Sequence, residues 1–240
     1  MTESLLILYE DPHCLAVVKH AGLLTQGIPG RESTLEGAVR RHLRPDDPAS
    51  AYIATVHRLD RPVSGVVVWA KTPKAARRLA AQFADRQAVK EYWAVVEEAP
   101  GASEPSLDAA GTWDDWVTPP DASGVARAVA PRAPGARRAV TRYQCDRAGR
   151  LPPGTAWLRL WPETGRTHQL RAQAAARGAP ILGDSTYGST RPFAPGIALH
   201  ARALTIEHPI LRRALCLVAP LPDAWSEQGI RLPETPVARS

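Results

Sequence analysis

The stretch His57-Arg58-Leu59-Asp60-Arg61-Pro62-Val63-Ser64-Gly65 leads directly into the apolar run Val66-Val67-Val68-Trp69-Ala70. A short apolar run that follows Pro and Gly is typical of a buried strand. The stretch therefore places Asp60 in the loop before such a strand, with Arg58 and Arg61 on either side. A carboxylate at this position suits a charged or polar substrate, whereas a merely solvated Asp–Arg pair would contribute little.

The elements around this stretch mix strands and helices without a regular alternation. Strands are expected at residues 5–9, 14–19, 52–56, 65–70, 89–97, 139–145, 155–161 and 197–206. Helices are expected from the capping pattern Ser33-Thr34-Leu35-Glu36 to before Pro45, from Thr72-Pro73 onward, and from about 166 to 177, before Gly178. This order predicts an α+β fold, a single domain with a large mixed, mainly antiparallel sheet flanked by helices.

The predicted domain spans residues 1–225. Within it, residues 99–138 are rich in Pro, Gly, Ala and Asp and predict an irregular meander, in which Trp113 and Trp116 anchor short strands. Residues 226–240 lack hydrophobic periodicity and are expected to form a flexible tail.

Composition excludes several classes of protein. The 240 residues are 44% hydrophobic and 22% charged, as in a globular protein. No apolar run is long enough to span a bilayer, and the N-terminus lacks the basic start of a secretory signal. The three isolated cysteines support neither a disulfide framework nor a cysteine zinc site. A cytoplasmic protein, monomeric and without a membrane partner, is the plain expectation.

The net charge of +6 comes from arginine, since only Lys19, Lys71, Lys74 and Lys90 are lysines. Arginine's planar fork suits phosphates and base edges, so a basic, arginine-rich chain favours a nucleic-acid partner. A GC-rich genome would also enrich arginine, together with the abundant Ala, Pro and Gly. Charge alone leaves both explanations open.

A second informative stretch is Thr164-Gly-Arg-Thr-His-Gln-Leu-Arg171. Helical spacing aligns Arg171 with the core-facing stripe of the expected helix, and a buried arginine needs a partner. Asp60 is the most economical partner, and the alternative is that Arg171 reaches solvent along its stem. Arg166 and His168 lie at the predicted N-terminal turn, where backbone N–H groups favour a phosphate.

Taken together, these motifs resemble the RluA-type pseudouridine synthase family. The resemblance covers about residues 6–225 and rests on the stretches around Asp60 and Arg171, on Lys90-Glu-Tyr92-Trp-Ala94, on Leu182-Gly-Asp184, and on Leu199-His-Ala with Glu207-His208-Pro209. It implies a catalytic domain without an N-terminal S4-type RNA-binding domain. Departures include His20, Val63 and Gln173, at positions where the family commonly has proline, threonine and histidine.

The resemblance also implies roles for single residues. Asp60 would be the nucleophile, Tyr92 would pack against the uracil, and Arg171 would pair with the aspartate. Arg58 would occupy the place of the flipped base, and His57, Arg61, Arg166 and His168 would contact RNA or support the site. The implied reaction converts uridine to pseudouridine in rRNA or tRNA and needs no cofactor and no metal.

Two other classes of protein remain open from the sequence. One is an RNA-binding protein or chaperone in which the site is present but inactive. The other is a metal-dependent nuclease or hydrolase with His57, His168, His200 and His208 as ligands, although no pair of these has the i, i+4 spacing of a helical metal site. Activity of an Asp60→Ala variant and activity in EDTA would separate these classes.

Overall fold

The computed structural model describes residues 5–27, 33–98, 107–146 and 148–233. The strands among these residues build a large, mainly antiparallel sheet with helices beside it, so the predicted α+β class is confirmed. The chain of this domain divides into two compact units. Unit 1 comprises Met1–Val89 and Ala201–Leu221, and unit 2 comprises Lys90–His200 and Pro222–Ser240.

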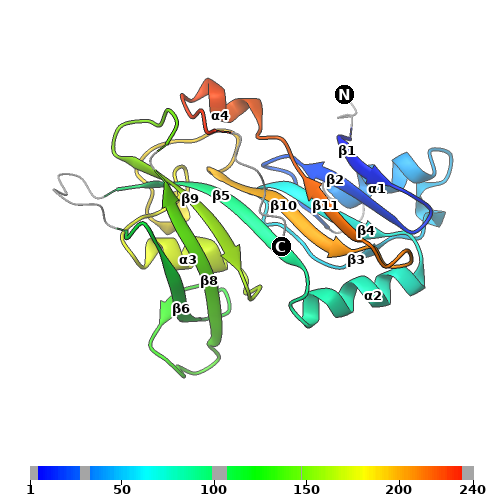
Figure 1. The fold of residues 1–240 in the computed structure, drawn as a ribbon, viewed down its shortest axis with the longest axis horizontal. Helices are drawn as coiled ribbons and strands as arrows, with labels where there is room; N and C mark the ends of the chain where they lie inside the picture. The colour runs from blue at the N-terminus through cyan, green and yellow to red at the C-terminus, as the bar shows by residue number, and fades with distance from the viewer. Residues whose placement is uncertain (1–4, 28–32, 99–106, 147, 234–240) are drawn as a thin grey trace. The chain divides into compact units, whose positions relative to one another are not determined.

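Unit 1 is built around two fully buried strands, β2 (Cys14–Lys19) and β4 (Ser64–Ala70), which pair antiparallel. Around them the strand order is β1-β2-β4-β10, with β3 paired to β4 and β11 to β10 (Figure 1). The bounds of these other strands are β1 Ile7–Glu10, β3 Ala54–Thr55, β10 Leu199–Glu207 and β11 Ala214–Val218. Burial of both faces explains why 66–70 is a continuous apolar run rather than an alternating one.

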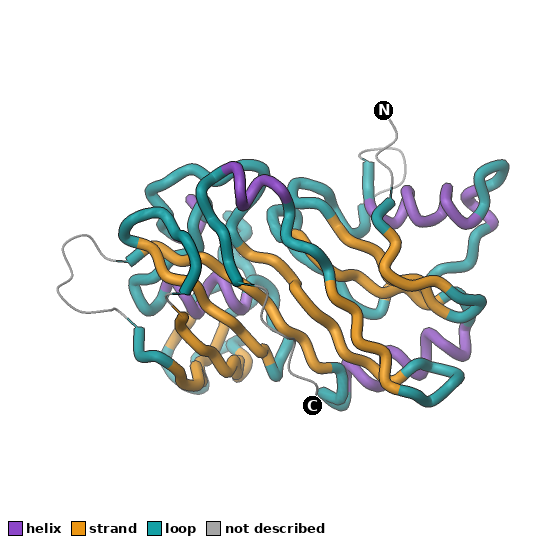
Figure 2. The backbone as a smooth tube through the Cα atoms, turned by 45° about the horizontal axis from the view of Figure 1, so that its top comes forward, coloured by secondary structure: helices purple, strands orange, loops and turns teal. Residues whose placement is uncertain are grey.

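Helices cover both faces of the strands of unit 1. α1 (Leu35–Leu43) and α2 (Pro73–Ala84) lie on opposite sides of them (Figure 2). α2 begins as expected, with Thr72 as N-cap and proline at its first position. α1 begins one residue later than the capping pattern indicated, because Thr34 rather than Ser33 caps it by accepting the Gly37 N–H.

The strands of unit 2 pair antiparallel in the order β5-β9-β8-β6-β7, of which Figure 1 labels the first four. α3 packs its Ala172 against a small cluster of Val117, Ala126 and Ala139. The bounds are β5 Val89–Glu97, β6 Ala110–Val117, β7 Ala128–Val129, β8 Arg137–Asp146, β9 Thr155–Pro162, α3 Gln169–Ala175 and α4 Asp223–Glu227. Single 3-10 turns occupy Pro48–Ser50 in unit 1 and Ser185–Tyr187 in unit 2.

Three expectations need correction in unit 2. Within the predicted meander, β6 is a regular strand paired with β8 along its whole length; residues 99–106 lie outside the described part. α3 starts at Gln169 rather than near 166, because His168 has a left-handed backbone (φ 54°). Ile230 is only 1% exposed and Arg231 pairs with Arg150, so 226–233 is packed rather than loose, while 234–240 lie outside the described residues.

No helix in the described ranges is both long and apolar enough to cross a membrane.

Gly65 joins the Asp60 loop to the buried strand β4 in a conformation that only glycine adopts easily. Its φ is +126°, and a Cβ built on it would overlap the backbone oxygen and nitrogen of Ala201 and lie 2.6 Å from the Ala201 Cβ. Both a backbone restraint and a packing restraint therefore select glycine here.

We expect Gly65→Ala to lower the free energy of unfolding by about 2–5 kcal/mol, since it adds backbone strain to overpacking. Gly154→Ala is the matched control, because Gly154 also has a positive φ (68°) but nothing within 4 Å of its Cβ position. Strain alone predicts a loss of about 1–2 kcal/mol for the control. Urea denaturation measures both variants, and equal losses would contradict the packing argument.

Candidate active site

Asp60 lies in a loop of unit 1 whose backbone is held on both sides of it. The loop connects β3 to β4, and the Val63 N–H donates to the Asp60 carbonyl at 3.1 Å, closing a turn. Before Asp60, both backbone groups of Leu59 bond to the Thr25 hydroxyl. After Asp60, the Arg61 carbonyl accepts the Gly22 N–H at 2.8 Å. The chain segment 19–25, which follows β2, thus fixes the loop.

Lys19 places a buried amino group beside this loop. Its side chain is 0% exposed, and its Nζ donates to the carbonyls of His20 (3.1 Å), Leu23 (2.6 Å) and Arg61 (3.1 Å). Burial lowers the pKa of Lys19 to about 7, while the Asp60 carboxylate raises it. The ammonium is therefore both a structural donor for the loop and an electrostatic neighbour of Asp60.

Three residues near Asp60 that were predicted to contact RNA, His57, Arg58 and Arg61, differ in their hydrogen-bond partners. The Nε2 of His57 accepts the Val68 N–H at 3.0 Å, and its ring stacks on Phe83 with 4.7 Å between centroids. The Nε of Arg61 donates to the Gly22 carbonyl at 3.1 Å. Arg58 is exposed. His57 and Arg61 therefore support the loop itself, and Arg58 is the residue of the three most open to a ligand.

Unit 2 carries the other predicted catalytic residues. Tyr92 is half-buried on β5, opposite Leu160 of β9. Arg171 is buried on α3, as its place on the core-facing stripe predicted.

Arg171 belongs to a buried network that the sequence did not predict. Its Nε and Nη2 donate to the two carboxylate oxygens of Asp184 at 2.6 and 2.8 Å, and both side chains are nearly inaccessible. Its guanidinium also lies 4.7 Å from the centre of the Tyr187 ring. The Tyr187 hydroxyl accepts the Ala126 N–H and lies 3.0 Å from Nδ1 of His168. Ion pair and ring together fix the plane of the guanidinium.

Gln169 organises the turn that precedes α3. Its Oε1 accepts the Arg166 N–H at 3.0 Å and the Thr164 hydroxyl at 2.7 Å, and its Nε2 donates to the Val140 carbonyl at 3.1 Å. The Nε of Arg166 donates to the Arg138 carbonyl at 3.0 Å. Residues 164–168 therefore form a bonded loop before the helix, in which Arg166 and His168 have supporting contacts.

Sequence reasoning located the loops and missed several of the side chains that hold them. Asp184 and Tyr187 follow the quoted Leu182-Gly183 pair, so their place in the motif was the available signal. Gln169 lies within the quoted 164–171 stretch, so it had the same signal, whereas Thr25 carried none. Gln173, one of the departures from the family pattern, accepts the Thr141 hydroxyl at 2.7 Å and donates to Asp115 at 2.8 Å. The pairing of Arg171 with Asp60 stays a prediction.

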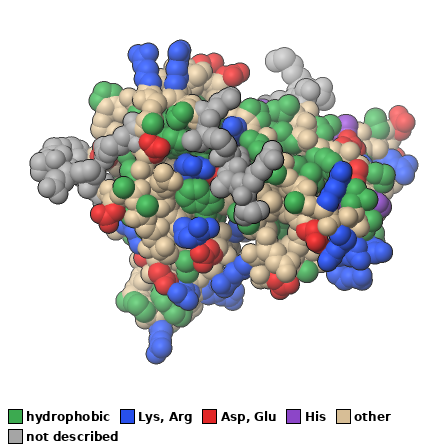
Figure 3. All heavy atoms as spheres, in the orientation of Figure 1, with side chains coloured by type: hydrophobic (Ala, Val, Ile, Leu, Met, Phe, Trp, Pro, Cys, Tyr) green, Lys and Arg blue, Asp and Glu red, His purple; other side chains and the backbone are tan. Residues whose placement is uncertain are grey.

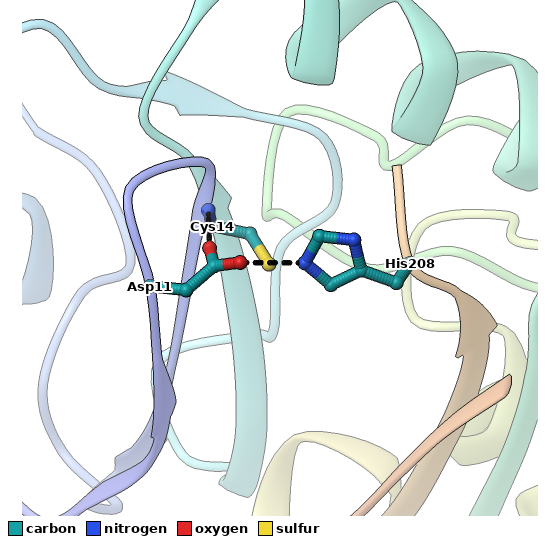
Figure 4. A group of neighbouring side chains, drawn as sticks. All are labelled: Asp11, Cys14 and His208. Atoms are coloured by element: carbon teal, nitrogen blue, oxygen red, sulfur yellow. Dashed lines mark hydrogen bonds and ion pairs between the residues drawn. The ribbon is translucent and has the colours of Figure 1, made fainter. Parts of the chain in front are cut away.

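Among the described residues, one group has the spacing of a metal site: Asp11, Cys14 and His208 in unit 1 (Figure 4). Its hydrogen bonds do not fit that role. Nδ1 of His208 accepts the N–H groups of Ile210 and Leu211, so the ring proton lies on Nε2 and donates to Asp11 at 2.7 Å.

A metal on Nε2 would instead need the proton on Nδ1, donated to an acceptor. Burial also raises the pKa of the Cys14 thiol to about 12, with the Asp11 charge adding to the effect, which disfavours a thiolate ligand. The group is therefore a hydrogen-bonded staple between the β1–β2 turn and the turn after β10.

The buried pair Arg171–Asp184 yields a stability prediction. Asp184→Asn leaves the Arg171 charge without its carboxylate partner and should lower the free energy of unfolding by about 3–5 kcal/mol. Asp114→Asn is the matched control, because it breaks an exposed bidentate pair with Arg138 and should have little effect. Chemical denaturation followed by circular dichroism measures both. A similar loss in the two variants would contradict the importance of burial.

The staple yields a pH prediction. Burial raises the pKa of Asp11, but hydrogen bonds from the Cys14 and His13 N–H groups and from His208 outweigh it and lower the pKa to about 2, from an ordinary 3.8. The charged carboxylate therefore stabilises the fold above about pH 4, and this contribution is lost as pH falls through 2. Wild type should exceed Asp11→Asn in stability at pH 5, and urea denaturation should show the difference shrinking towards pH 2. A constant difference would contradict it.

Residues 13–176 match the family model described as RNA pseudouridylate synthase. Among curated relatives, the dual-specificity RNA pseudouridine synthase RluA of Escherichia coli (strain K12) is 37% identical over 218 residues, covering 90% of this chain and 93% of the relative. An uncharacterized RNA pseudouridine synthase of Synechocystis sp. is 33% identical over 224 residues, covering 90% of this chain and 65% of the relative.

Solved structures agree with this assignment. The human RNA pseudouridylate synthase domain containing 4 has a TM-score of 0.70 and 26% identity, covering 95% of each chain. The human RNA pseudouridylate synthase domain containing 1 has a TM-score of 0.75 and shares the fold at 24% identity, covering 98% of this chain and 93% of that one. With the Asp60 loop inside the matched region, the chain belongs to the RNA pseudouridylate synthase family, in its RluA-type branch.

Proposed function

We propose that this protein isomerises uridine to pseudouridine in structured rRNA or tRNA, with Asp60 as the nucleophile. The observation that carries the proposal is the Asp60 loop: a half-buried carboxylate, held by backbone bonds on both sides, with the Lys19 ammonium close enough for the two charges to interact. A nucleophilic carboxylate must be held in place, and the backbone bonds on both sides of Asp60 favour this condition.

The isomerisation of uridine requires a nucleophile such as this carboxylate and no other reagent in its net reaction. The reaction breaks the C1′–N1 bond of the nucleotide, turns the uracil and rejoins it through C5, with a proton leaving C5 and one arriving at N1. Reactant and product are isomers, so the net reaction needs no oxidant and no water. We propose that the enzyme acts without a metal ion, as a cytoplasmic monomer.

The remaining site residues take roles in the same proposal. A uridine in folded RNA must leave its stack, which costs a few kcal/mol. In this proposal the exposed Arg58 occupies the vacated position in the RNA, and the ring of Tyr92 packs against the extruded uracil. Arg171, whose plane Asp184 and Tyr187 fix, takes in this proposal the role of the basic partner of the aspartate. His57, Arg61, Arg166 and His168 hold the loops that present these groups and contact RNA.

The surface charge on the face drawn in Figure 3 is compatible with RNA and does not form one extended basic patch there. On the face drawn in Figure 3, Lys and Arg side chains are spread out and interspersed with acidic ones. Several exposed arginines are already paired with carboxylates: Arg127 with Asp121, Arg138 with Asp114, Arg142 with Glu163, and Arg212 with Glu207. Recognition is therefore expected to depend on the loops around Asp60 more than on one extended basic patch.

Asp60→Ala and Asp60→Asn should abolish pseudouridine formation, a loss of at least about 10⁴-fold, on the scale seen when a nucleophile is removed. The measurement is incubation with unmodified tRNA and rRNA transcripts, followed by site mapping of pseudouridine. Asp46→Ala, which removes an exposed carboxylate of the same unit, is the control and should keep full activity.

Each other outcome points to one of the alternatives. New pseudouridine with the Asp60 variants would overturn the nucleophile. RNA binding by wild type without any product would favour the inactive RNA-binding protein. Loss of activity in EDTA would contradict the metal-free reaction.

A further inference from the structure

Among the residues that surround Asp60 in the sequence (Arg58, Leu59 and Arg61), only Leu59 has a buried side chain. Leu59 is 6% exposed, while Arg58 and Arg61 are exposed. The position of the Asp60 backbone on its N-terminal side therefore depends on how Leu59 is held.

A single hydroxyl satisfies both backbone groups of Leu59. The Oγ1 of Thr25 accepts the Leu59 N–H at 3.2 Å and donates to the Leu59 carbonyl at 2.8 Å. Thr25 is itself 3% exposed. Buried backbone groups that lose their partner are costly, so this one side chain decides whether two of them are paired.

Thr25 is in turn anchored to the first turn of α1. Its carbonyl accepts the Glu36 N–H at 3.0 Å, and the preceding carbonyl, of Leu24, accepts the Leu35 N–H at 2.9 Å. These bonds use N–H groups that a helix leaves without intrahelical partners. A continuous chain of bonds therefore leads from the N-terminus of α1 through Thr25 to Leu59.

We propose that Thr25 is a positioning residue for Asp60, acting through the backbone of Leu59. This role rests on the proposed function, since it assumes that Asp60 reacts with the RNA. The hydroxyl makes no contact with the reacting atoms in this role. Instead it sets where the Asp60 backbone lies, and a displacement of about 1 Å at a reacting group can cost roughly 100-fold in rate.

The test compares Thr25→Val, which keeps the shape and removes the hydroxyl, with Thr25→Ser, which restores it. In single-turnover reactions on a substrate RNA transcript, Thr25→Val should lower the rate roughly 10- to 100-fold, with RNA affinity unchanged. Hydrogen exchange of the peptide 57–63 should become faster in Thr25→Val and stay near wild type in Thr25→Ser. Thr25→Ala, which leaves room for a water, is the second variant should Thr25→Val not fold, and an intermediate rate is expected.

Thr155→Val is the matched control in unit 2. Thr155 is 7% exposed, and its hydroxyl donates to the Pro152 carbonyl at 2.6 Å, so the variant loses a similar buried bond away from the loop. It should change neither the rate nor the exchange of 57–63. An equal fall in rate in Thr155→Val would reduce the effect of Thr25 to general stability and overturn the positioning role.

Failure of the inference and failure of the proposed function give different results. An active wild type, together with a Thr25→Val variant that exchanges fast at 57–63 yet reacts at the wild-type rate, overturns the positioning role alone. Unchanged exchange at 57–63 in Thr25→Val would show that the Thr25 hydroxyl does not fix the Leu59 backbone, and would overturn the proposal. A wild type that forms no pseudouridine overturns the proposed function, and the positioning role with it. The exchange data would still show whether the Thr25 hydroxyl fixes the Leu59 backbone.

Discussion

Burial of the Lys19 ammonium is the constraint on which the organisation of unit 1 depends. A fully buried amino group is tolerated only when its donors are used, and here three carbonyls from two chain segments supply the acceptors, although burial still lowers its pKa to about 7. One of those carbonyls belongs to Arg61, next to Asp60. The Lys19 Nζ group therefore connects the segment after β2 to the loop before β4 through these hydrogen bonds. The same bonds that satisfy a buried group also fix the backbone next to the candidate nucleophile.

The two units provide hydrogen-bond partners for their buried polar groups in different ways. Around Asp60 the bonds run mostly to backbone carbonyls and N–H groups, so the loop is fixed while the Arg58 side chain stays exposed. Around Arg171 the partners are side chains, with Asp184 taking two donors of the guanidinium and Tyr187 lying against its face. A network of this kind specifies the orientation of one group at the expense of tolerance to substitution, because each member leaves another unsatisfied when it is removed.

Family membership and geometry constrain the function in complementary ways. Membership identifies an RNA pseudouridylate synthase. The geometry of unit 1 explains how a carboxylate is held on a loop without a regular element of its own, and why the glycine that follows it cannot carry a side chain.

The sequence by itself determined the elements with strong local signals: the strands 14–19, 65–70 and 89–97, the α2 cap at Thr72-Pro73, the loop that carries Asp60 and the helix that carries Arg171. These follow from periodicity, proline and capping chemistry, which act between near neighbours. Only the tertiary structure decided that α3 starts at Gln169, that 110–117 is a regular strand, that Asp184 is a partner of Arg171 and that Thr25 holds Leu59. Such partners lie between 13 and 34 residues apart in the chain. Their bonds form because burial leaves polar groups in need of a partner, and which partner comes within reach is a property of the packed fold rather than of any local pattern.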